Sequence, residues 1–185
     1  TIYGSPQRVT GVKGGAFAFD GNDDRIVVAN NSALELGQYT VSLWIYPEKN
    51  NENFTGVFGR NGRNYAIWMG NSNHATRPFV HHRFGEADNF NEGVDNFNLS
   101  VWNRWYHIAC SNGGIGGLAR TYVDGKFIVN NQRYERKVMG DLIRNQTAPL
   151  NIGVDPANEV SVNQYFLGKM DDIRLYNVPL GSEDV

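Results

Sequence analysis

The stretch from Trp102 to Phe127 is the part of this chain that most constrains its fold. Residues 105–110 are aromatic and apolar, the run SNGGIGG interrupts this pattern, and residues 118–123 resume it. Asp124-Gly125 comes next, a pair typical of tight hairpin turns because aspartate and glycine tolerate positive φ. The stretch therefore predicts three consecutive antiparallel strands, over residues 105–110, 118–123 and 126–129.

Strand-like alternation recurs along the rest of the chain. Residues 39–46 place Val41, Leu43 and Ile45 on one face and Trp44 on the other, and shorter alternating runs occur at 16–20, 57–60, 64–69 and 78–84. We expect a long surface loop over 86–98 and either a loop or a single helical turn over 132–146. A chain of 185 residues with no internal boundary predicts one domain, residues 1–185.

Three sequence blocks point to a known family. GGAFAFDGNDDRIVV, then WYHIA followed by YVDG, and finally FLGKMDDIRLYNVPL resemble the laminin-G-like, concanavalin A-like jelly-roll domains in order and spacing. The resemblance runs from about Gly14 to Leu180. It implies an all-β jelly-roll sandwich of two antiparallel sheets. It leaves function open, since this superfamily includes carbohydrate-binding modules, polysaccharide-cleaving enzymes, pentraxin-like proteins and protein-binding adhesion modules.

Composition narrows the classes of partner. A formal net charge of −2 lacks the excess of basic residues that is typical of nucleic-acid-binding domains and of polybasic membrane-binding patches. No apolar run approaches the length of a membrane span. Cys110 is the only cysteine and lies in an apolar strand, which predicts a buried, inert thiol. The chain starts at Thr1 without a signal region, so we expect a monomeric module from a longer secreted protein.

The motifs of catalytic relatives are missing. The Glu-x-Asp-x-x-Glu spacing associated with the glucanase branch does not occur, nor do the strand motifs of the alginate-lyase branch. His107 matches a strand position of the family and has no serine or cysteine nucleophile beside it in sequence. We therefore predict that the chain has no catalytic residues, although an enzyme with an unrecognised motif stays open.

The sequence from Asp20 to Asp24 indicates a metal site. Three carboxylates surround a glycine there, and calcium prefers such oxygen ligands. Parity places Asp171 on the core side of the last strand, with Ile173 and Leu175, where a carboxylate needs a cation or strong hydrogen bonds. In proteins that this chain resembles, the first turn and the final strand often share a structural calcium. Asp20, Asp171, Asn22 and Asp23 are the expected ligands; an arginine partner for Asp171 and a solvated acidic turn are the alternatives.

Residues 53–85 contain no acidic residue, which is unusual in a chain of net negative charge. Period two places Trp68, His81 and Arg83 away from the core, where guanidinium groups could grip sulfate or carboxylate and the indole could stack on a sugar ring. An ordinary solvated basic surface is the alternative. The candidate ligand-binding residues are Trp68, His81, Arg83, Arg77, Arg60, Arg63 and His74, with Arg120 and Tyr122 of the central hairpin as further candidates.

Together these observations predict a non-catalytic carbohydrate-binding module. Its expected partner is an anionic polysaccharide, sulfated or uronate-containing, and its expected place is an extracellular protein in which it is fused to a catalytic domain. A cell-adhesion or protein-interaction module of the laminin G type is the rival interpretation.

Overall fold

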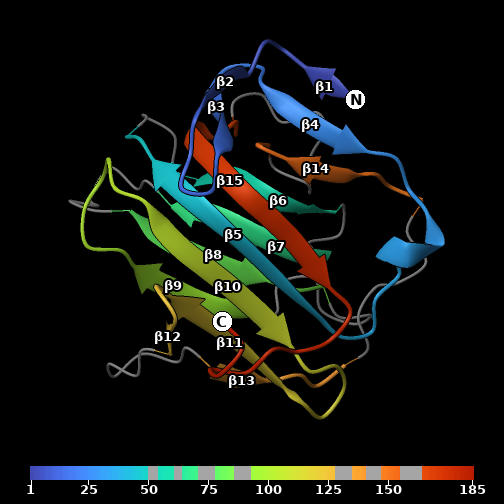
Figure 1. The fold of residues 1–185 in the computed structure, drawn as a ribbon. Helices are drawn as coiled ribbons and strands as arrows, with labels where there is room; N and C mark the ends of the chain where they lie inside the picture. The colour runs from blue at the N-terminus through green and yellow to red at the C-terminus, as the bar shows by residue number, and fades with distance from the viewer. Residues whose placement is uncertain are drawn as a thin grey trace.

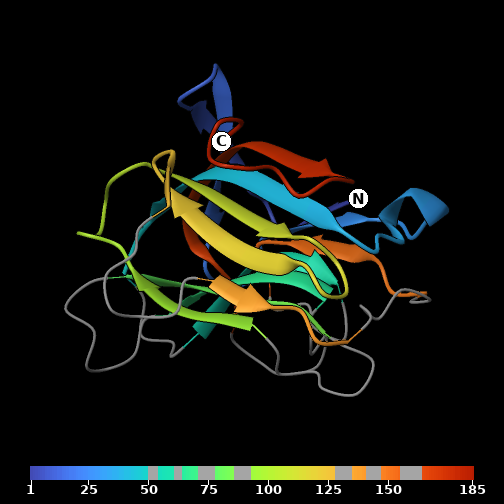
Figure 2. The same cartoon turned by 90° about the horizontal axis from the view of Figure 1, so that it is seen from below.

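The computed structural model of the chain describes residues 1–49, 54–60, 64–70, 78–85, 93–127, 135–140, 147–154 and 164–185. Two antiparallel sheets face each other across a hydrophobic core (Figure 1). Figure 2 shows the two layers from below, with the cyan, yellow and red strands of one sheet lying over the green strands of the other. The fold is the jelly-roll sandwich that the sequence predicted.

Sheet A has seven strands in the order β1, β4, β14, β6, β7, β8, β9. Their bounds are β1 Ile2–Tyr3, β4 Arg25–Val28, β14 Leu150–Ile152, β6 Phe54–Arg60, β7 Asn64–Gly70, β8 Phe79–Arg83 and β9 Gly93–Asn98. A 3₁₀ turn, η1 Ser32–Leu34, lies between β4 and the next strand. Within the described ranges no helix is long and apolar enough to cross a membrane.

Sheet B has eight strands, seven of them in the order β12, β11, β10, β5, β15, β3, β2, with β13 pairing β11. Their bounds are β12 Lys126–Phe127, β11 Leu118–Val123, β10 Tyr106–Asn112, β5 Tyr39–Pro47, β15 Leu167–Tyr176, β3 Gly15–Asp20, β2 Gln7–Thr10 and β13 Glu135–Lys137. The central hairpin is confirmed: β10, β11 and β12 succeed one another through Phe127, and Asp124 turns the chain with φ 51. Residues 128–129 lie outside the described residues.

Alternation along β5 divides its side chains between the core and the outer surface. Val41, Leu43 and Ile45 are fully buried in the core, whereas Trp44 is half-buried on the opposite, outer face. Cys110 on the neighbouring β10 is also fully buried, and burial raises the pKa of its thiol to about 12. The prediction of a buried thiol is confirmed, and it stays protonated at neutral pH.

Two segments differ from expectation because distant strands recruit them. Residues 93–98, expected in a loop, form β9, which pairs β8 from Phe79↔Asn98 to Arg83↔Gly93. Residues 135–137, expected in a loop or helical turn, pair β11 instead. Local sequence showed no alternation in either segment, so the unpaired edges of β8 and β11 decide their conformation.

The last strand contains an irregularity that changes which way its side chains point. The register against β5 shifts between Asp171 and Arg174, so Asp171 stands opposite the outward Trp44 while Leu175 stands opposite the buried Val41. An extra residue in one strand reverses the facing of the residues after it. The inward orientation expected for Asp171 is therefore wrong: it shares the outer face of sheet B with Trp44.

Candidate functional site

The outer face of sheet A brings together the three residues that the alternation predicted there. Trp68 on β7 stands directly opposite His81 on β8, and a guanidinium nitrogen of Arg83 lies 3.4 Å from Nδ1 of His81. The rings of Phe54 and Phe79 complete this group, which we call the sheet A face.

Accessibility on the sheet A face is uneven. His81 is only 5% exposed because the rings of Phe54 and Phe79 pack against it, each with a centroid 5.0 Å away. The expectation that His81 contacts a ligand at the surface is therefore wrong. Trp68 and Arg83 are half-buried and keep an accessible surface.

Arg60, expected at a ligand-binding surface, is fully buried. Its guanidinium donates to the carbonyls of Leu34 at 2.7 Å and Ala148 at 3.1 Å, and to Oδ1 of Asn30 at 2.6 Å. These acceptors satisfy a buried cation and join β6 to the segments around η1 and β14. Arg60 is therefore a structural residue, and its assignment as a ligand contact is wrong.

The other arginine and histidine candidates fall into two groups. Arg63, His74 and Arg77 lie outside the described residues. In the central hairpin, Tyr122 is only 2% exposed and packs on Phe127, so it offers no ligand contact, contrary to expectation. Arg120 is half-buried with its guanidinium 5.9 Å from the centroid of the Phe127 ring.

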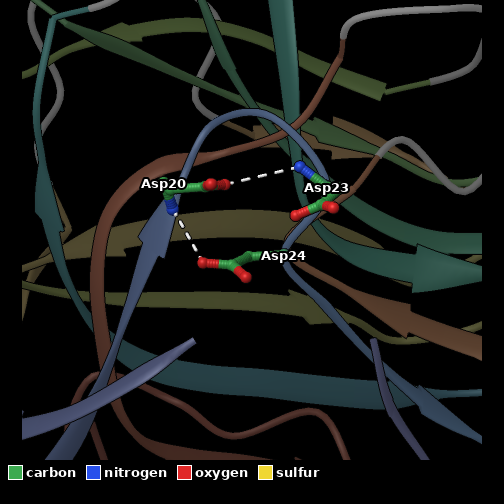
Figure 3. A group of neighbouring side chains, drawn as sticks. All are labelled: Asp20, Asp23 and Asp24. Carbon is green, nitrogen blue, oxygen red and sulfur yellow. Dashed lines mark hydrogen bonds between the residues drawn. The ribbon is translucent and has the colours of Figure 1, made fainter. Parts of the chain in front are cut away.

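The acidic turn between β3 and β4 gathers three carboxylates. One oxygen from each of Asp20, Asp23 and Asp24 lies within 4.8 Å of the others (Figure 3). Asp20 accepts hydrogen bonds from the backbone N–H and the side-chain amide of Asn22. Asp24 is nearly buried and accepts from the backbone N–H groups of Ser5 and Asp20. This set of hard oxygen donors fits a calcium ion.

Electrostatics at the turn favour the ionised form of Asp20. Burial acts to raise the pKa of Asp20, but the hydrogen bonds from Asn22 and its neighbours outweigh it and hold the pKa below its ordinary value. The carboxylate is therefore charged at neutral pH, as a calcium ligand must be.

Asp171 does not join this turn. Asp20 stands opposite Leu167 in the β3–β15 register, four residues before Asp171, which corresponds to about 13 Å along a strand. Asp171 is 6% exposed, and its oxygens accept the backbone N–H groups of Lys13 and Asp172, each at 2.7 Å. Backbone donors satisfy its oxygens, and it lies too far along the strand to share an ion with Asp20, so the expected shared ligation by Asp20 and Asp171 is wrong.

A cavity of about 570 Å³ opens on the outer face of sheet B, and we call it the sheet B cleft. Side chains of β5 and β10 form its floor, and the turn after β11, the end of β15, Lys13 and the C-terminal segment form its walls. The lining residues are Lys13, Ser42, Trp44, Arg104, Trp105, His107, Asp124, Gly125, Asp172, Arg174, Tyr176, Leu180, Asp184 and Val185.

Aromatic rings run along the floor of the cleft. The rings of Trp44 and His107 lie 5.2 Å apart and tilted by 49°, and Trp105 lies edge-on to Tyr46 at 5.6 Å. They meet because β5 and β10 are paired with Trp44 opposite His107. An apolar surface therefore crosses two strands inside a cavity that also holds charged groups.

The same register brings a serine to His107. Ser42 Oγ hydrogen-bonds Nε2 of His107 at 2.8 Å, an adjacency that sequence neighbours could not reveal. Burial lowers the pKa of His107 below its ordinary value, only partly offset by the negative charges of Asp124 and Asp172, so the imidazole is neutral at pH 7. Asp124 uses its oxygens on the His107 backbone N–H and on Arg104. In the described part of the chain no carboxylate hydrogen-bonds the His107 ring, so the orienting acid of a triad is missing.

Sequence reasoning missed the cleft, although part of its signal was present. Alternation in 39–46 placed Trp44 on the surface, and WYHIA placed Trp105 and His107 two residues apart. What could not be read was the register that pairs the two strands and the bulge that turns Asp171 outward beside Asp172.

A family model described as the concanavalin A-like lectin/glucanases superfamily matches residues 20–185. The chain belongs to this superfamily. Comparison with curated protein sequences gave no match.

Solved structures agree with this membership at the level of the fold. Domain 4 of AbnA, a GH43 extracellular arabinanase from Geobacillus stearothermophilus solved with arabinotriose, has a TM-score of 0.67 and 20% identity, over 98% of this chain and 79% of that one. A structure of botulinum neurotoxin type C, whose cell entry depends on two ganglioside molecules, has a TM-score of 0.69 and 14% identity. The binding domain of botulinum neurotoxin serotype D has a TM-score of 0.64 and 17% identity. The match to each neurotoxin chain covers 100% of this chain but only 44% of the neurotoxin chain.

Proposed function

We propose that the chain is a non-catalytic carbohydrate-binding module that recognises a polysaccharide. The sheet B cleft carries this proposal, because Trp44 and Trp105 stand there beside acidic and basic side chains. A sugar ring offers an apolar face and several hydroxyl groups, and sites that bind such ligands combine aromatic walls with a few placed polar groups. The likeness to the arabinanase domain solved with arabinotriose supports the same function.

The proposal includes a preference for an anionic chain, sulfated or uronate-containing, on the sheet A face. Trp68 and Arg83 support it, because they keep accessible surface on neighbouring strands, in a region of sequence free of acidic residues from 53 to 85. A guanidinium binds sulfate or carboxylate in bidentate fashion, and an indole can stack on the ring that carries the anion.

The proposal also places the module outside the cell, attached to a polysaccharide-active enzyme. Support comes from the arabinanase domain, which belongs to an extracellular enzyme. Within such a protein, a binding module would hold the polysaccharide near the catalytic domain and raise its local concentration.

A glycan array followed by affinity measurement tests the function. We expect anionic polysaccharides to bind, and binding to weaken at high salt because salt screens exposed charge pairs. Arg83→Ala should weaken their binding by roughly 1.5 to 3 kcal/mol, the range of a hydrogen bond to a charged group. Trp68→Ala should weaken binding but leave its salt dependence nearly intact. Arg8→Ala, which removes an exposed arginine from β2 of the opposite sheet, is the matched control and should change little.

Two outcomes would contradict these statements separately. If no glycan on the array binds the wild-type protein, the carbohydrate-binding function is wrong and a protein-interaction module is favoured. If anionic chains bind without sensitivity to salt or to Arg83→Ala, the anionic preference of the sheet A face is wrong.

A further inference from the structure

The charges of the sheet B cleft are balanced, unlike those of the sheet A face. Three lining side chains are basic, Lys13, Arg104 and Arg174, and three are acidic, so their formal charges cancel. An anionic sugar entering the cleft would face carboxylates as well as cations, and repulsion of this kind excludes wrong ligands. The charge pattern therefore selects against a strongly anionic ligand.

Internal pairs fix these charges in place. Arg104 bonds Asp124 at 2.8 Å on one wall of the cleft. On the other wall Asp172 accepts from Arg174 at 2.8 Å and lies 3.2 Å from the ammonium of Lys13. Each arginine has five N–H donors, so it retains donors beyond those used in its pair. Each wall thus presents a carboxylate acceptor beside a guanidinium donor.

Backbone geometry holds both aspartates where they line the cleft. Asp124 in the turn after β11 has φ 51, and Asp172 in the bulge of β15 has φ 48. Aspartate tolerates this left-handed region in tight turns and bulges. A hairpin turn and a strand bulge therefore fix where the two carboxylates of the cleft stand.

Hydroxyl groups suit this arrangement better than anions do. A hydroxyl donates one hydrogen bond and accepts others. Of two neighbouring sugar hydroxyls, one can therefore donate a hydrogen bond to the carboxylate of a pair while the other accepts one from its guanidinium. Because each pair is already held by its own hydrogen bonds, little side-chain freedom is lost on binding. Trp44 and Trp105 supply the apolar surface for the ring itself.

We infer that the sheet B cleft binds an uncharged saccharide unit, through hydroxyl groups on the Arg104–Asp124 and Arg174–Asp172 pairs and stacking on Trp44 or Trp105. The inference rests on the proposed function and names the ligand class of this site. The protein therefore has two saccharide surfaces on opposite sheets, one for uncharged units and one for anionic chains.

Calorimetric titration with trisaccharides tests the inference. The probes are neutral trisaccharides of arabinose, glucose, mannose and galactose, with trigalacturonate as the anionic counterpart. We expect at least one neutral probe to bind with an affinity that is nearly independent of salt, since no exposed charge pair forms. Trp44→Ala should weaken the affinity for this neutral probe about tenfold or more, which corresponds to a loss of roughly 1.4 kcal/mol of binding free energy. Tyr3→Ala, which removes an exposed aromatic ring from β1 on the other sheet, is the matched control and should leave the binding unchanged.

A second pair of variants keeps the test independent of the tryptophan at position 44. Trp105→Ala removes the other ring of the cleft by a change outside β5 and should also weaken binding. Asp172→Asn leaves the two cations of that wall in excess, so it should weaken the neutral probe and improve trigalacturonate. Circular dichroism in the near ultraviolet checks that each variant keeps its packing.

Three results would overturn the inference. In the first, a neutral probe binds as tightly to folded Trp44→Ala and Trp105→Ala as to the wild type, so its site lies elsewhere while the proposed function stands. In the second, trigalacturonate binds more tightly than every neutral probe and Trp44→Ala abolishes it, so the cleft is anionic. In the third, anionic polysaccharides bind but no neutral saccharide does. Failure of every glycan to bind would instead contradict the proposed function.

Discussion

His82 shows how a single side chain couples the core of this protein to pH. It points inward from β8, is fully buried, and hydrogen-bonds the hydroxyl of Tyr39 through Nε2 at 2.8 Å. Burial, with a smaller contribution from the positive charge of Arg83, lowers its pKa to about 3. The imidazole is therefore neutral in the folded protein over the whole range in which a histidine ordinarily titrates.

This lowered pKa predicts a loss of stability in mild acid. The unfolded chain takes up a proton on His82 near pH 6.5, whereas the folded chain resists it down to about pH 3, so acid favours unfolding between these values. The free energy of unfolding should fall by about 1.4 kcal/mol for each pH unit below 6.5 on account of this residue. Urea unfolding of the wild type and of His82→Gln at pH 7, 6, 5 and 4 measures this pH dependence of the free energy of unfolding.

The glutamine variant is the control, because it can still hydrogen-bond Tyr39 but does not titrate. Carboxylates protonate in both proteins and contribute equally to their acid sensitivity. The difference in unfolding free energy between wild type and variant should therefore shrink as pH falls from 6.5. Parallel pH profiles would show that His82 is not buried and neutral in solution.

At the scale of elements, the turn between β3 and β4 is where we propose a structural calcium ion. The turn supplies carboxylates from Asp20, Asp23 and Asp24, and Asp24 takes the place that the sequence had given to Asp171. An ion bound here would neutralise three clustered negative charges and tie β3 to β4, strands that belong to different sheets.

Calcium should therefore raise the melting temperature and a chelator should lower it. If calcium binds only the folded state, a calcium concentration about 100 times the dissociation constant raises the free energy of unfolding by roughly 2.7 kcal/mol. Asp20→Ala should abolish the difference between melting curves recorded with calcium and with chelator. Asp171→Asn should keep the difference while melting lower overall, because Asp171 lies away from the turn and bonds backbone N–H groups. If the wild type melts identically with calcium and with chelator, the proposed calcium site is wrong.

The whole molecule presents two outward sheet faces with different chemistry. The sheet A face has Trp68 and Arg83 in a window without acidic residues, and the outer face of sheet B has a charge-balanced aromatic cleft. A sandwich can carry two such surfaces because its core needs only the inward half of each alternating strand.

The absence of turnover is a prediction for the intact protein. Ser42 and His107 are hydrogen-bonded in the cleft, but His107 lacks an orienting carboxylate among the described residues, so activation of the serine is not complete. We expect no reducing ends and no unsaturated products from any bound polysaccharide, measured against a blank without protein. Products that disappear in folded Ser42→Ala or His107→Ala would establish an enzyme.

The sequence by itself determined most of the strands, the facing of their regular parts and the family. Period-two alternation placed Val41, Leu43 and Ile45 on one face of their strand and Trp44 on the other, and Asp124-Gly125 predicted the central hairpin. Both signals could be read because each arises within a few residues of the sequence. The same reasoning placed Trp68, His81 and Arg83 on one outer face, which the register of β7 and β8 confirms.

Only the tertiary structure decided what these faces hold. Arg60 is buried because carbonyls from distant segments converge on it, and Asp171 points outward because β15 bulges against β5. The sheet B cleft exists because pairing sets Trp44 against His107 and brings Arg174 and Lys13 to the same opening. Alternation fixes the face of a residue within its own strand, whereas register and bulges depend on pairing between strands that lie far apart in the chain.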